Sequence, residues 1–538
     1  MSNQERAAKM SQEEIVALLD SYQNLSARFD KTQLQLDWLK RQLFGAKSER
    51  HLVSEVSRQL TLGEMPPADP QIQATVEIPA HKRGRKSQTE SDSEGDLRFD
   101  ESVPVERIVL PAPVAAAERE QYEQIGEKTT RKLAQRPGSY VILEYVRPVL
   151  KKKADAEAIA DEIICATAPA MVLDRSFADV SLLAGILIDK FLYHLPLYRQ
   201  HQRMAAGGVH ISRGSLTNWV HRCAELLAPI DAAQLASILA SSVLAMDETP
   251  LKVGLEKGKP PGRGKMATGY FWPVYGDRHE VCFHFAPTRS HSVVPSLLAD
   301  FKGTLLTDGY EAYTQYASKA AAVRHAACWV HTRRGFEKAL DSDHELADEA
   351  LVRIGLLYEI ESALKKSAAS PQKVLARRAV ESKPAVEAFF KWLQDLQTER
   401  ALLPTSPFAK AMAYALEREA GLKVFLEDPS VPLDTNHLER QIRPVAIGRK
   451  NWLFCWTEIG ARYAGVVQGL LSTCRLQGVD PYTYLVDVLQ RVQDHPAREV
   501  ADLTPRLWKA RFAGAPLQSD LDRLPKSIEA ASRQDGGD

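Results

Sequence analysis

Three acidic residues, far apart along the chain, have the types and placement of a metal-binding catalytic site. Asp247 ends the apolar segment 242–247, Asp308 ends a similar segment at 303–308, and Glu439 lies on a later helix. Both segments are expected to be buried strands, and ligands of open α/β sheets gather at the carboxyl ends of strands. Mg²⁺ prefers carboxylate oxygens, and two such ions about 3.5–4 Å apart can promote in-line displacement at phosphorus. The three carboxylates therefore predict phosphodiester chemistry assisted by two divalent ions, Mg²⁺ or Mn²⁺.

The two aspartates also have plainer interpretations. Asp308 begins an Asp-Gly pair, which is common in turns, and Asp247 could be a turn residue as well. Glu248 is an alternative to Asp247, although the alternation of side chains along a strand would point it to the opposite face. We therefore expect Asp247, rather than its neighbour, to face the metal ions.

The third carboxylate has alternatives too. Asp434 could supply it, but Asp-Thr-Asn before a helix fits an N-cap better. Glu439 and Arg443 are i, i+4 neighbours on that helix, so they could also form an ordinary surface ion pair. The local pattern leaves both interpretations of Glu439 open.

Positive charge gathers around the expected metal ligands. The helix with Glu439 also carries Arg440, Arg443, Arg449 and Lys450 and is followed by Trp452, while an earlier block holds His331, Arg333 and Arg334. Basic groups beside a metal site suit a DNA backbone, and an aromatic ring there can stack on an unpaired base near a cut end. The alternatives are solvated arginines and a core position for the tryptophan.

Cys328 and His331, with His325 close by in the sequence, have part of the composition of a zinc site. Two or three ligands without a fourth nearby are weak grounds for zinc. We expect these residues to have a structural or DNA-facing role close to the metal centre.

The segment around the aspartates has the pattern of a mixed α/β sheet. Three apolar strands are followed by a helix and then by further strands that alternate with helices. Pro273, in the second strand, suggests an edge strand or a bulge. The expected strands are 242–247, 269–275, 280–285, 303–308 and 324–329, the expected helices are 292–301 and 331–340, and 341–430 is expected to be almost wholly helical.

The N-terminal part predicts two further features. Apolar residues in 15–43 follow heptad spacing, which favours a coiled coil between copies of the chain, although a helix packed on its own chain also fits. A polar linker follows, and its basic cluster could grip phosphates or simply be solvated. The cluster consists of Lys82, Arg83, Arg85 and Lys86.

Residues 173–232 are expected to be helical and to contain the outline of a helix-turn-helix. A helix at 196–204 is followed by glycines and then by a helix that Ser212 can cap. The residues that could face a DNA groove are Arg213, Ser215, Thr217 and Asn218. Any helical hairpin with a glycine turn has a similar pattern, so this remains one of two interpretations.

The length and the composition limit the class of protein that this chain can be. A chain of 538 residues predicts several domains, and equal numbers of basic and acidic residues, 69 each, neither favour nor exclude nucleic acid. The six cysteines show no CxxC pair, which predicts reduced thiols, and the polar N-terminus has no signal-peptide core. We expect a soluble protein of the cytoplasm.

Four sequence blocks together resemble the insertion sequence 66 family of bacterial transposases, of the TnpC type. They are MDETP (246–250), TDGYEAY (307–313), CWVHTRR (328–334) and DTNHLERQIRPVAIGRKNWLF (434–454). LKRQLFGAKSE (39–49), HLPLYRQ (194–200) and GVDPYTYL (478–485) resemble the same family, so the likeness spans nearly the whole chain. The resemblance implies an α/β RNase H-like catalytic core with a large helical insertion and a DDE metal triad, which falls on Asp247, Asp308 and Glu439.

One region departs from that family. Related transposases carry a cysteine-rich zinc module between zipper and core, whereas 98–172 holds only Cys165, so no zinc is expected. Without metal, such a small β-rich module must be held by packing against its neighbours. The expected division is 1–50 coiled coil, 51–97 basic linker, 98–172 β-rich module, 173–232 helix-turn-helix-like region, 233–340 first part of the core, 341–430 helical insertion, 431–460 core helix with Glu439, and 461–538 C-terminal helical region and tail.

The resemblance and the site residues together predict a DNA transposase. It would cut transposon ends and join them to target DNA, acting as a homo-oligomer through the coiled coil and with accessory proteins of the same element. The alternatives are a catalytically idle DNA-binding or assembly subunit and a nuclease that does not join strands.

Overall fold

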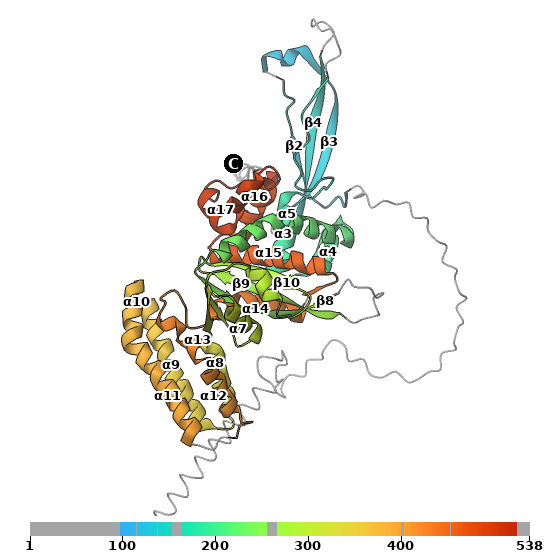
Figure 1. Ribbon diagram of the computed structural model, residues 1–538. Helices are drawn as coiled ribbons and strands as arrows, with labels where there is room; N and C mark the ends of the chain where they lie inside the picture. Colours follow the sequence, from blue (N-terminus) through green and yellow to red (C-terminus); the bar gives the residue numbers. More distant parts are fainter. Residues whose placement is uncertain are drawn as a thin grey trace, which may run out of the picture. The chain divides into compact units, whose positions relative to one another are not determined.

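A computed structural model describes residues 97–114, 116–136, 138–152, 163–254, 266–399, 403–451 and 453–523 (Figure 1). The predicted coiled coil of 1–50, the basic cluster at 82–86 and Trp452 lie outside these ranges. None of the helices in the described ranges combines the length and apolar character that a membrane span requires.

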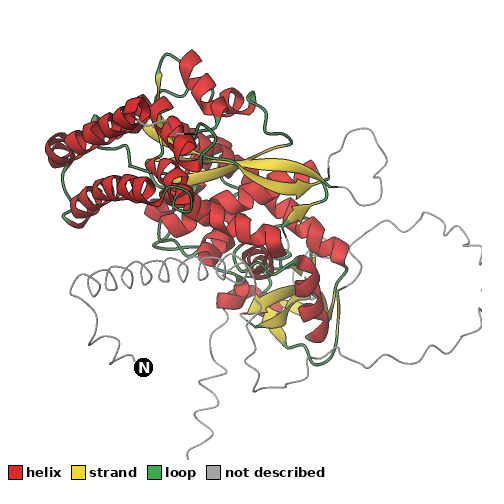
Figure 2. Ribbon diagram, turned by 90° about the horizontal axis from the view of Figure 1, so that it is seen from below, coloured by secondary structure: helices red, strands yellow, loops and turns green. Residues whose placement is uncertain are grey.

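A seven-stranded mixed sheet occupies the centre of the described residues (Figure 2). β9 pairs antiparallel with β7, β8 and β10, while β11 lies parallel to both β7 and β12, and β13 lies parallel to β8. The strands are β7 (Val243–Met246), β8 (Thr249–Val253), β9 (Ala267–Gly276), β10 (Glu280–Ala286), β11 (Gly303–Thr307), β12 (Val323–Ala327) and β13 (Phe454–Cys455). The predicted mixed α/β sheet is therefore present, and β8 and β13 are strands that the sequence analysis missed.

The two residues that link β7 to β8 interrupt the antiparallel pairing of these strands with β9. Both short strands pair with β9, and only Asp247 and Glu248 separate them. Pro273 lies opposite this link, and its carbonyl accepts from the Asp247 backbone N–H at 3.5 Å. The expectation of an edge strand or bulge at Pro273 was wrong, because β9 is paired on both sides. The missing N–H of proline is tolerated there because the neighbouring strand is interrupted at that point.

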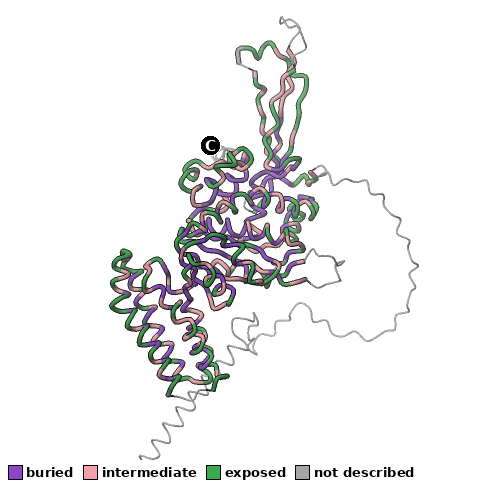
Figure 3. Tube along the Cα trace, in the orientation of Figure 1, coloured by how far each residue is buried: buried purple, intermediate pink, exposed green. Residues whose placement is uncertain are grey.

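Alternation along the strands gives the sheet two apolar faces. Ala245, Leu251 and Phe271 belong to a core with α3 (Val180–Phe191), α5 (Arg213–Leu239) and α15 (Glu458–Leu476). Side chains on the other face, such as Leu244 and Trp272, pack with α6 (Val293–Leu298) and α7 (Glu311–Lys319). Figure 3 shows the buried residues concentrated in these layers. A sheet covered on both faces holds the ends of its strands in fixed positions.

A separate apolar core lies in the helical part of the chain between β12 and β13. Six aromatic rings are buried there: Trp329, Phe336, Phe389, Phe390, Phe408 and Phe425. The helices are α8 (Trp329–Ala339), α9 (His344–Lys366), α10 (Pro371–Arg377), a π-helical turn (Arg378–Ser382), α11 (Lys383–Glu399), α12 (Pro407–Glu417) and α13 (Glu419–Lys423), followed by a 3₁₀ turn (Val424–Leu426). The structure thus has helices through most of 341–430, where the sequence pattern predicts them.

Arg378, in the π-helical turn, connects this helical part to the chain that returns to the sheet. Its side chain is 3% exposed and forms two 2.8 Å bonds to the Glu361 carboxylate. It also donates to the backbone carbonyls of Phe425, at 2.6 Å, and Asp428, at 2.9 Å. One buried guanidinium therefore fixes the loop that leads into α14 (Asn436–Asn451).

The predicted β-rich module is a four-stranded sheet around a long hairpin. β4 pairs with β3, β2 and β5, and the separate pair of β1 and β6 links the module's start to the helices. Tyr145 of β4 donates to Asp520 at 2.6 Å and packs with Leu521 in a small core. Contacts with residues near the C-terminus thus help to hold the β-rich module in place. The strands are β1 (Arg98–Phe99), β2 (Val105–Val109), β3 (Tyr122–Arg136), β4 (Ser139–Lys152), β5 (Ile163–Cys165) and β6 (Val209–His210).

The outline of a helix-turn-helix is present. α4 (Leu197–Ala206) ends at two glycines, and Gly208 has a φ of +80°, a conformation that L side chains rarely adopt. α5 begins after Ser212, whose hydroxyl accepts from the Ser215 backbone N–H at 3.0 Å. The serine cap that the sequence predicts is therefore formed.

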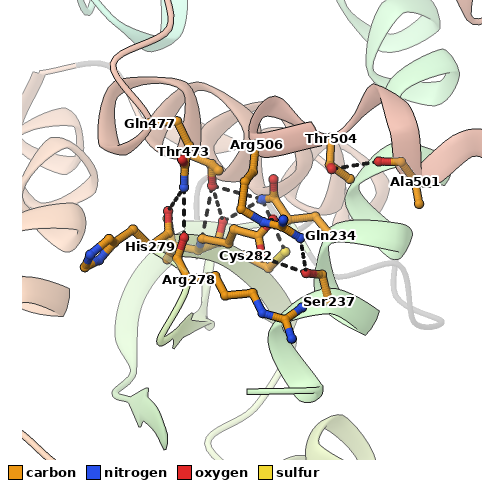
Figure 4. A network of polar contacts seen from close by, with 12 residues as sticks. Gln234, Ser237, Arg278, His279, Cys282, Thr473, Gln477, Ala501, Thr504 and Arg506 are labelled. Atoms are coloured by element: carbon orange, nitrogen blue, oxygen red, sulfur yellow. Dashed lines mark hydrogen bonds and ion pairs between the residues drawn. The ribbon is translucent and has the colours of Figure 1, made fainter. Parts of the chain in front are cut away.

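A buried polar network joins the C-terminal helices to the sheet (Figure 4). Gln234 of α5 donates to the Val281 carbonyl and to Thr473, each at 3.0 Å. Arg506 donates at 3.0 Å to Glu280, whose side chain is fully buried. Thr473 lies on α15 and Arg506 on α17 (Pro505–Arg511). The other C-terminal helices are α16 (Pro481–Arg491) and α18 (Asp520–Arg523), with a 3₁₀ segment at Ala497–Leu503.

Asp231, on the same face of α5, predicts a pH dependence of stability. One of its carboxylate oxygens is buried without a hydrogen-bond partner, and burial raises its pKa to about 7. In the unfolded chain an aspartate has a pKa of about 3.9. Between these values the unfolded state ionises while the folded state keeps its proton, so the free energy of unfolding falls as the pH rises to about 7.

Asp231→Asn should abolish this fall in the free energy of unfolding with rising pH. Above pH 7 the variant should be more stable than the parent by up to about 1.4 kcal/mol for each unit of the pKa shift, and below pH 4 the difference should vanish. Urea unfolding at several pH values measures it. Equal stability of the two proteins at pH 8 would contradict an ionised, buried Asp231.

Candidate metal centre and adjoining cleft

Asp247 and Asp308 meet at one edge of the central sheet. Asp247 directly follows β7 and Asp308 directly follows β11, and these two strands are parallel neighbours. The carboxyl ends of adjacent parallel strands point to the same edge, so the two side chains converge. With Glu248 they form a group in which one carboxylate oxygen from each residue lies within 4.8 Å of the other two. This is the densest acidic cluster around the residues that the sequence singled out.

The cluster is electrostatically strained. Burial, together with the nearby charges of Asp308, Glu248 and Glu439, raises the pKa of Asp247 to about 7. Burial and neighbouring carboxylates both disfavour the ionised form. A divalent cation would relieve this repulsion directly, because it neutralises the charges that the site brings together.

Glu248 is held by protein groups on both carboxylate oxygens. One oxygen pairs with Arg289, and the other accepts from the Tyr313 hydroxyl at 2.6 Å. Arg289 in turn lies over the Tyr310 ring, 3.9 Å from its centroid. The expectation that Glu248 faces away was wrong, because Asp247 and Glu248 occupy the link between two strands, where side chains need not alternate.

Arg289 and Tyr313 are site residues that the sequence analysis did not identify. Tyr313 could have been found from its position, since it ends the TDGYEAY block (307–313) that also holds Asp308 and lies in the first turn of α7. Arg289 lies in the segment between β10 and α6 and has no pattern around it that indicates a partner at Glu248.

Glu439 lies beside the cluster rather than within it. It is in the first turn of α14, and one carboxylate oxygen accepts from Arg334 at 2.5 Å. The other oxygen is buried, has no hydrogen-bond partner, and lies 3.9 Å from the His331 Nε2 atom. Glu439 nevertheless contributes to the raised pKa of Asp247, so it belongs to the same electrostatic centre.

The block at 328–334 positions the start of α14. The Thr435 backbone N–H lies 3.3 Å from the buried Cys328 sulfur, and the Trp329 N–H donates to the Leu433 carbonyl at 3.1 Å. Burial raises the pKa of Cys328, which disfavours a thiolate. Asp434 caps its own turn, accepting from the Asn436 N–H at 2.9 Å. Cys328 thus has a structural role, and Asp434 is engaged at the helix start.

A cleft of about 760 Å³ opens beside the acidic cluster. Asp308 lies on its wall together with Tyr310, His331 and Tyr414. Four basic residues complete the wall: Arg289, Arg334, Lys338 and Lys410. Arg334 and Lys338 come from α8 and Lys410 from α12, so the helical part of the chain supplies three of these four basic residues. Basic walls around carboxylates suit a ligand that carries phosphates and binds through cations.

The other residues predicted to bind DNA are distributed over three places. Arg440, Arg443, Arg449 and Lys450 are exposed along α14, and Arg449 also donates to the Pro250 carbonyl at 2.8 Å. Arg333 pairs with Glu337 on α8 and does not line the cleft. Arg213 and Asn218 line a different groove. Trp452, Lys82, Arg83, Arg85 and Lys86 are outside the described residues.

The residues present fit divalent cations. Asp247, Asp308 and Glu439 supply hard oxygen ligands, and the buried, unpartnered oxygen of Glu439 is an atom that a cation would satisfy. Burial and the nearby guanidinium of Arg334 lower the pKa of His331, which leaves its ring neutral beside the same carboxylates. The donor set therefore suits cations at the end of the basic cleft where Asp308 lies.

Comparison with known proteins gives three family matches. Models described as "Transposase IS66 family", "IS66 C-terminal element" and "Transposase C of IS166 homeodomain" match residues 175–463, 470–506 and 32–108. The chain is 29% identical over 508 residues to the uncharacterized protein y4hP of Sinorhizobium fredii, covering 89% of each. It is 30% identical over 428 residues to y4qI of the same organism, covering 76% of each.

One solved structure also aligns with this chain, the "Drosophila P element transposase strand transfer complex". The alignment has 11% sequence identity, a TM-score of 0.20, and coverage of 66% of this chain and 90% of the other. A similarity of that size supports no conclusion about the fold.

Proposed function

This chain belongs to the IS66 family of transposases, and we propose that it is a DDE-type enzyme that cuts DNA at transposon ends and joins them to target DNA. The observation that carries the proposal is the convergence of Asp247 and Asp308 at adjacent strand ends, with Glu439 beside them. Carboxylates that are far apart in sequence and brought together at a sheet edge are what a two-ion phosphoryl-transfer site requires.

The strand order supports an RNase H-like core. Counted along the chain, the first three strands, with β7 and β8 as one interrupted strand, form an antiparallel meander through β9 to β10. The next two, β11 and β12, lie parallel to the first on its other side. Glu439 then arrives from a helix after the helical insertion, which is the position that the DDE assignment needs.

We assign the cation ligands to Asp247, Asp308 and Glu439. Two Mg²⁺ or Mn²⁺ ions, when bound, would supply the charge that stabilises the attacking and leaving oxygens of an in-line displacement. Glu248, fixed by Tyr313 and Arg289, holds the adjacent Asp247 in place. Since both of its oxygens are already occupied, Glu248 serves better as a positioning residue than as a ligand.

The basic residues of the cleft and of α14 would hold the DNA backbone. Arg334, Lys338 and Lys410 line the cleft beside Asp308. The exposed Arg440 and Arg443 extend the positive surface from the first turn of α14. Phosphate contacts of this kind position a duplex without reading its sequence. His331 lies too close to Glu439 to serve mainly as a phosphate contact, and we assign it to the catalytic end of the cleft.

The assembly that we propose is a homo-oligomer joined through the predicted N-terminal coiled coil, acting in the cytoplasm and associated with the nucleoid when bound to DNA. Accessory proteins encoded by the same element are further partners. The second candidate is a catalytically idle DNA-binding subunit of such an assembly. The Arg334–Glu439 ion pair favours it to a limited extent, because it occupies one carboxylate oxygen of the third ligand.

A strand-transfer assay on the purified full-length protein tests the function. The substrates are a labelled duplex that carries the element's end and an unlabelled target duplex, incubated with Mg²⁺ or with EDTA. We expect a cut end and a joined product that both require Mg²⁺. Binding of the end without cutting would identify an idle subunit, and cutting without joining would identify a nuclease.

A further inference from the structure

A second groove lies at the far end of α14 from Glu439. Its volume is about 1090 Å³, and Asn451, the last residue of α14, is on its wall. The rest of the wall comes from the C-terminal end of α3, the N-terminal end of α4, the N-terminal turns of α5, the chain at β13 and the first turns of α15. None of the proposed cation ligands lines this groove, so the cation site does not explain it.

Exposed aromatic rings face this groove. The exposed fraction is 76% for Trp456 and 55% for Tyr198, and both residues line the wall. Arg213 lies over the Tyr198 ring, with its guanidinium carbon 5.9 Å from the centroid. Leaving two large rings in water is unfavourable, so exposed aromatic residues gathered in one concavity mark a binding site. The flat faces of nucleobases are suitable partners, because every base can stack on an aromatic ring.

Phosphate-binding groups accompany the rings. Arg213 and Lys190 line the groove, and burial lowers the pKa of Lys190 to about 8, so a bound anion would stabilise its charged form. The N-terminal ends of α5 and α15 also open here, capped by Ser212 and Thr457. Helix N-termini add partial positive charge to the two basic side chains. Stacking surfaces combined with positive charge match a DNA strand better than an apolar peptide.

The backbone at Trp456 is held by the strand that begins next to the metal centre. Gly254, directly after β8, donates to the Cys455 carbonyl at 2.9 Å. A Cβ atom on Gly254 would lie 2.2 Å from the Trp456 carbonyl oxygen, closer than any real contact. Only glycine permits this approach, so Gly254 fixes the position from which the tryptophan projects.

The spacing of the two sites along α14 suits one DNA molecule. From Glu439 to Asn451 the helix rises roughly 18 Å, at 1.5 Å per residue. That length corresponds to about five nucleotide steps of a strand at 3.4 Å each. The exposed Arg443, Arg449 and Lys450 lie on the same helix between the two sites.

We propose that this groove binds an unpaired nucleobase of the DNA strand on which the metal centre acts, stacked on Trp456 and Tyr198. The inference rests on the proposed function for the presence of DNA. A base within a duplex has both faces covered by its neighbours, so the rings can engage only a base that has left the stack. Arg213 and Asn218, which the sequence analysis assigned to a duplex groove, would then contact the extruded nucleotide.

The test uses full-length Asp247→Asn protein, so that DNA is not consumed, and oligonucleotides that contain 2-aminopurine. One probe is single-stranded, one is a duplex with 2-aminopurine at a mismatch, and one is a fully paired duplex. We expect the single-stranded and mismatched probes to bind, with fluorescence quenched by stacking on the rings. Trp456→Ala and Tyr198→Ala should each weaken binding of these probes about tenfold and reduce the quenching, while binding of the paired duplex stays unchanged.

Two further variants sharpen the result. Gly254→Ala keeps both rings but displaces the Trp456 backbone, so it should reduce quenching as well. Tyr193→Ala removes a ring that is 67% exposed but does not line the groove, and it should behave like the parent. Unchanged quenching in Trp456→Ala and Tyr198→Ala, or failure of the parent to bind either unpaired probe, would overturn the proposal. Cutting of the paired substrate by Asp247→Asn would overturn the proposed cation site and leave the groove intact.

Discussion

Asp247→Asn should lower Mg²⁺-dependent cutting of an end-containing duplex by at least about 10³-fold, because the ligand lost helps to supply several kcal/mol of charge stabilisation. DNA binding should change less than about twofold, since phosphate contacts from the basic cleft supply most of the affinity. Asp308→Asn should behave in the same way, because both carboxylates lie in one cluster. Single-turnover cleavage and fluorescence anisotropy measure the two quantities separately.

Glu248→Gln is the matched control for that result. It also removes a carboxylate from the cluster, but a carboxamide can still accept from Tyr313. If Glu248 only positions its neighbour, cutting should fall by about 10–100-fold, as for residues that support metal ligands. A folding defect is separable by thermal melting, in which Mg²⁺ should stabilise the parent and not Asp247→Asn. If Asp247→Asn cut DNA at the parent rate, that result would contradict the assignment of Asp247 as a catalytic cation ligand.

Arg378→Met should be the most destabilising single substitution among those considered. It leaves the Glu361 carboxylate without its partner and three backbone carbonyls, of Phe425, Asp428 and Val431, without a donor. Removing one member of a buried ion pair costs about 3–5 kcal/mol. Urea unfolding should therefore show a midpoint far below that of the parent.

The neighbouring Arg377 provides the control for Arg378. It is exposed and pairs with Glu381 across one helical turn, so Arg377→Met should cost no more than about 0.5 kcal/mol. A destabilisation by Arg378→Met as small as that of Arg377→Met would show that the contacts of Arg378 with the loop before α14 contribute little to stability.

The positions of the two aspartates at one sheet edge could be predicted from the sequence, for a physical reason. Val243 to Met246 and Gly303 to Thr307 are short, apolar segments, and each is followed directly by its aspartate. Burial of such a segment in a covered sheet leaves its polar end residue at the sheet edge, and parallel neighbours bring two such ends together. No long-range information beyond strand adjacency was needed.

The position of Glu248 could not be predicted in the same way. Alternation assumes a continuous strand, and the break between β7 and β8 depends on how both segments pair with β9. β8 itself alternates buried and exposed residues, but Pro250 obscures that pattern in the sequence. The partners Arg289 and Tyr313 come from other elements, and only the tertiary fold brings them to Glu248.

The placement of Glu439 was also only partly predictable. Its position on a helix follows from the local pattern, and α14 has Glu439 in its first turn. Its ion pair with Arg334 depends on how α8 and α14 meet, which the contacts of Cys328 and Trp329 with the start of α14 determine. Those contacts join residues about a hundred positions apart, and no local pattern indicates them.

The short strand β8 has a geometric consequence for the protein. It begins one residue after Glu248 and ends next to Gly254, which contacts the Trp456 backbone. Arg449, in the last turn of α14, also donates to the Pro250 carbonyl of β8, so both elements connect the region of the metal centre with the second groove. If the metal centre cuts DNA as we propose, the number of nucleotides between the scissile bond and a base held at Trp456 should be constant from one DNA sequence to another.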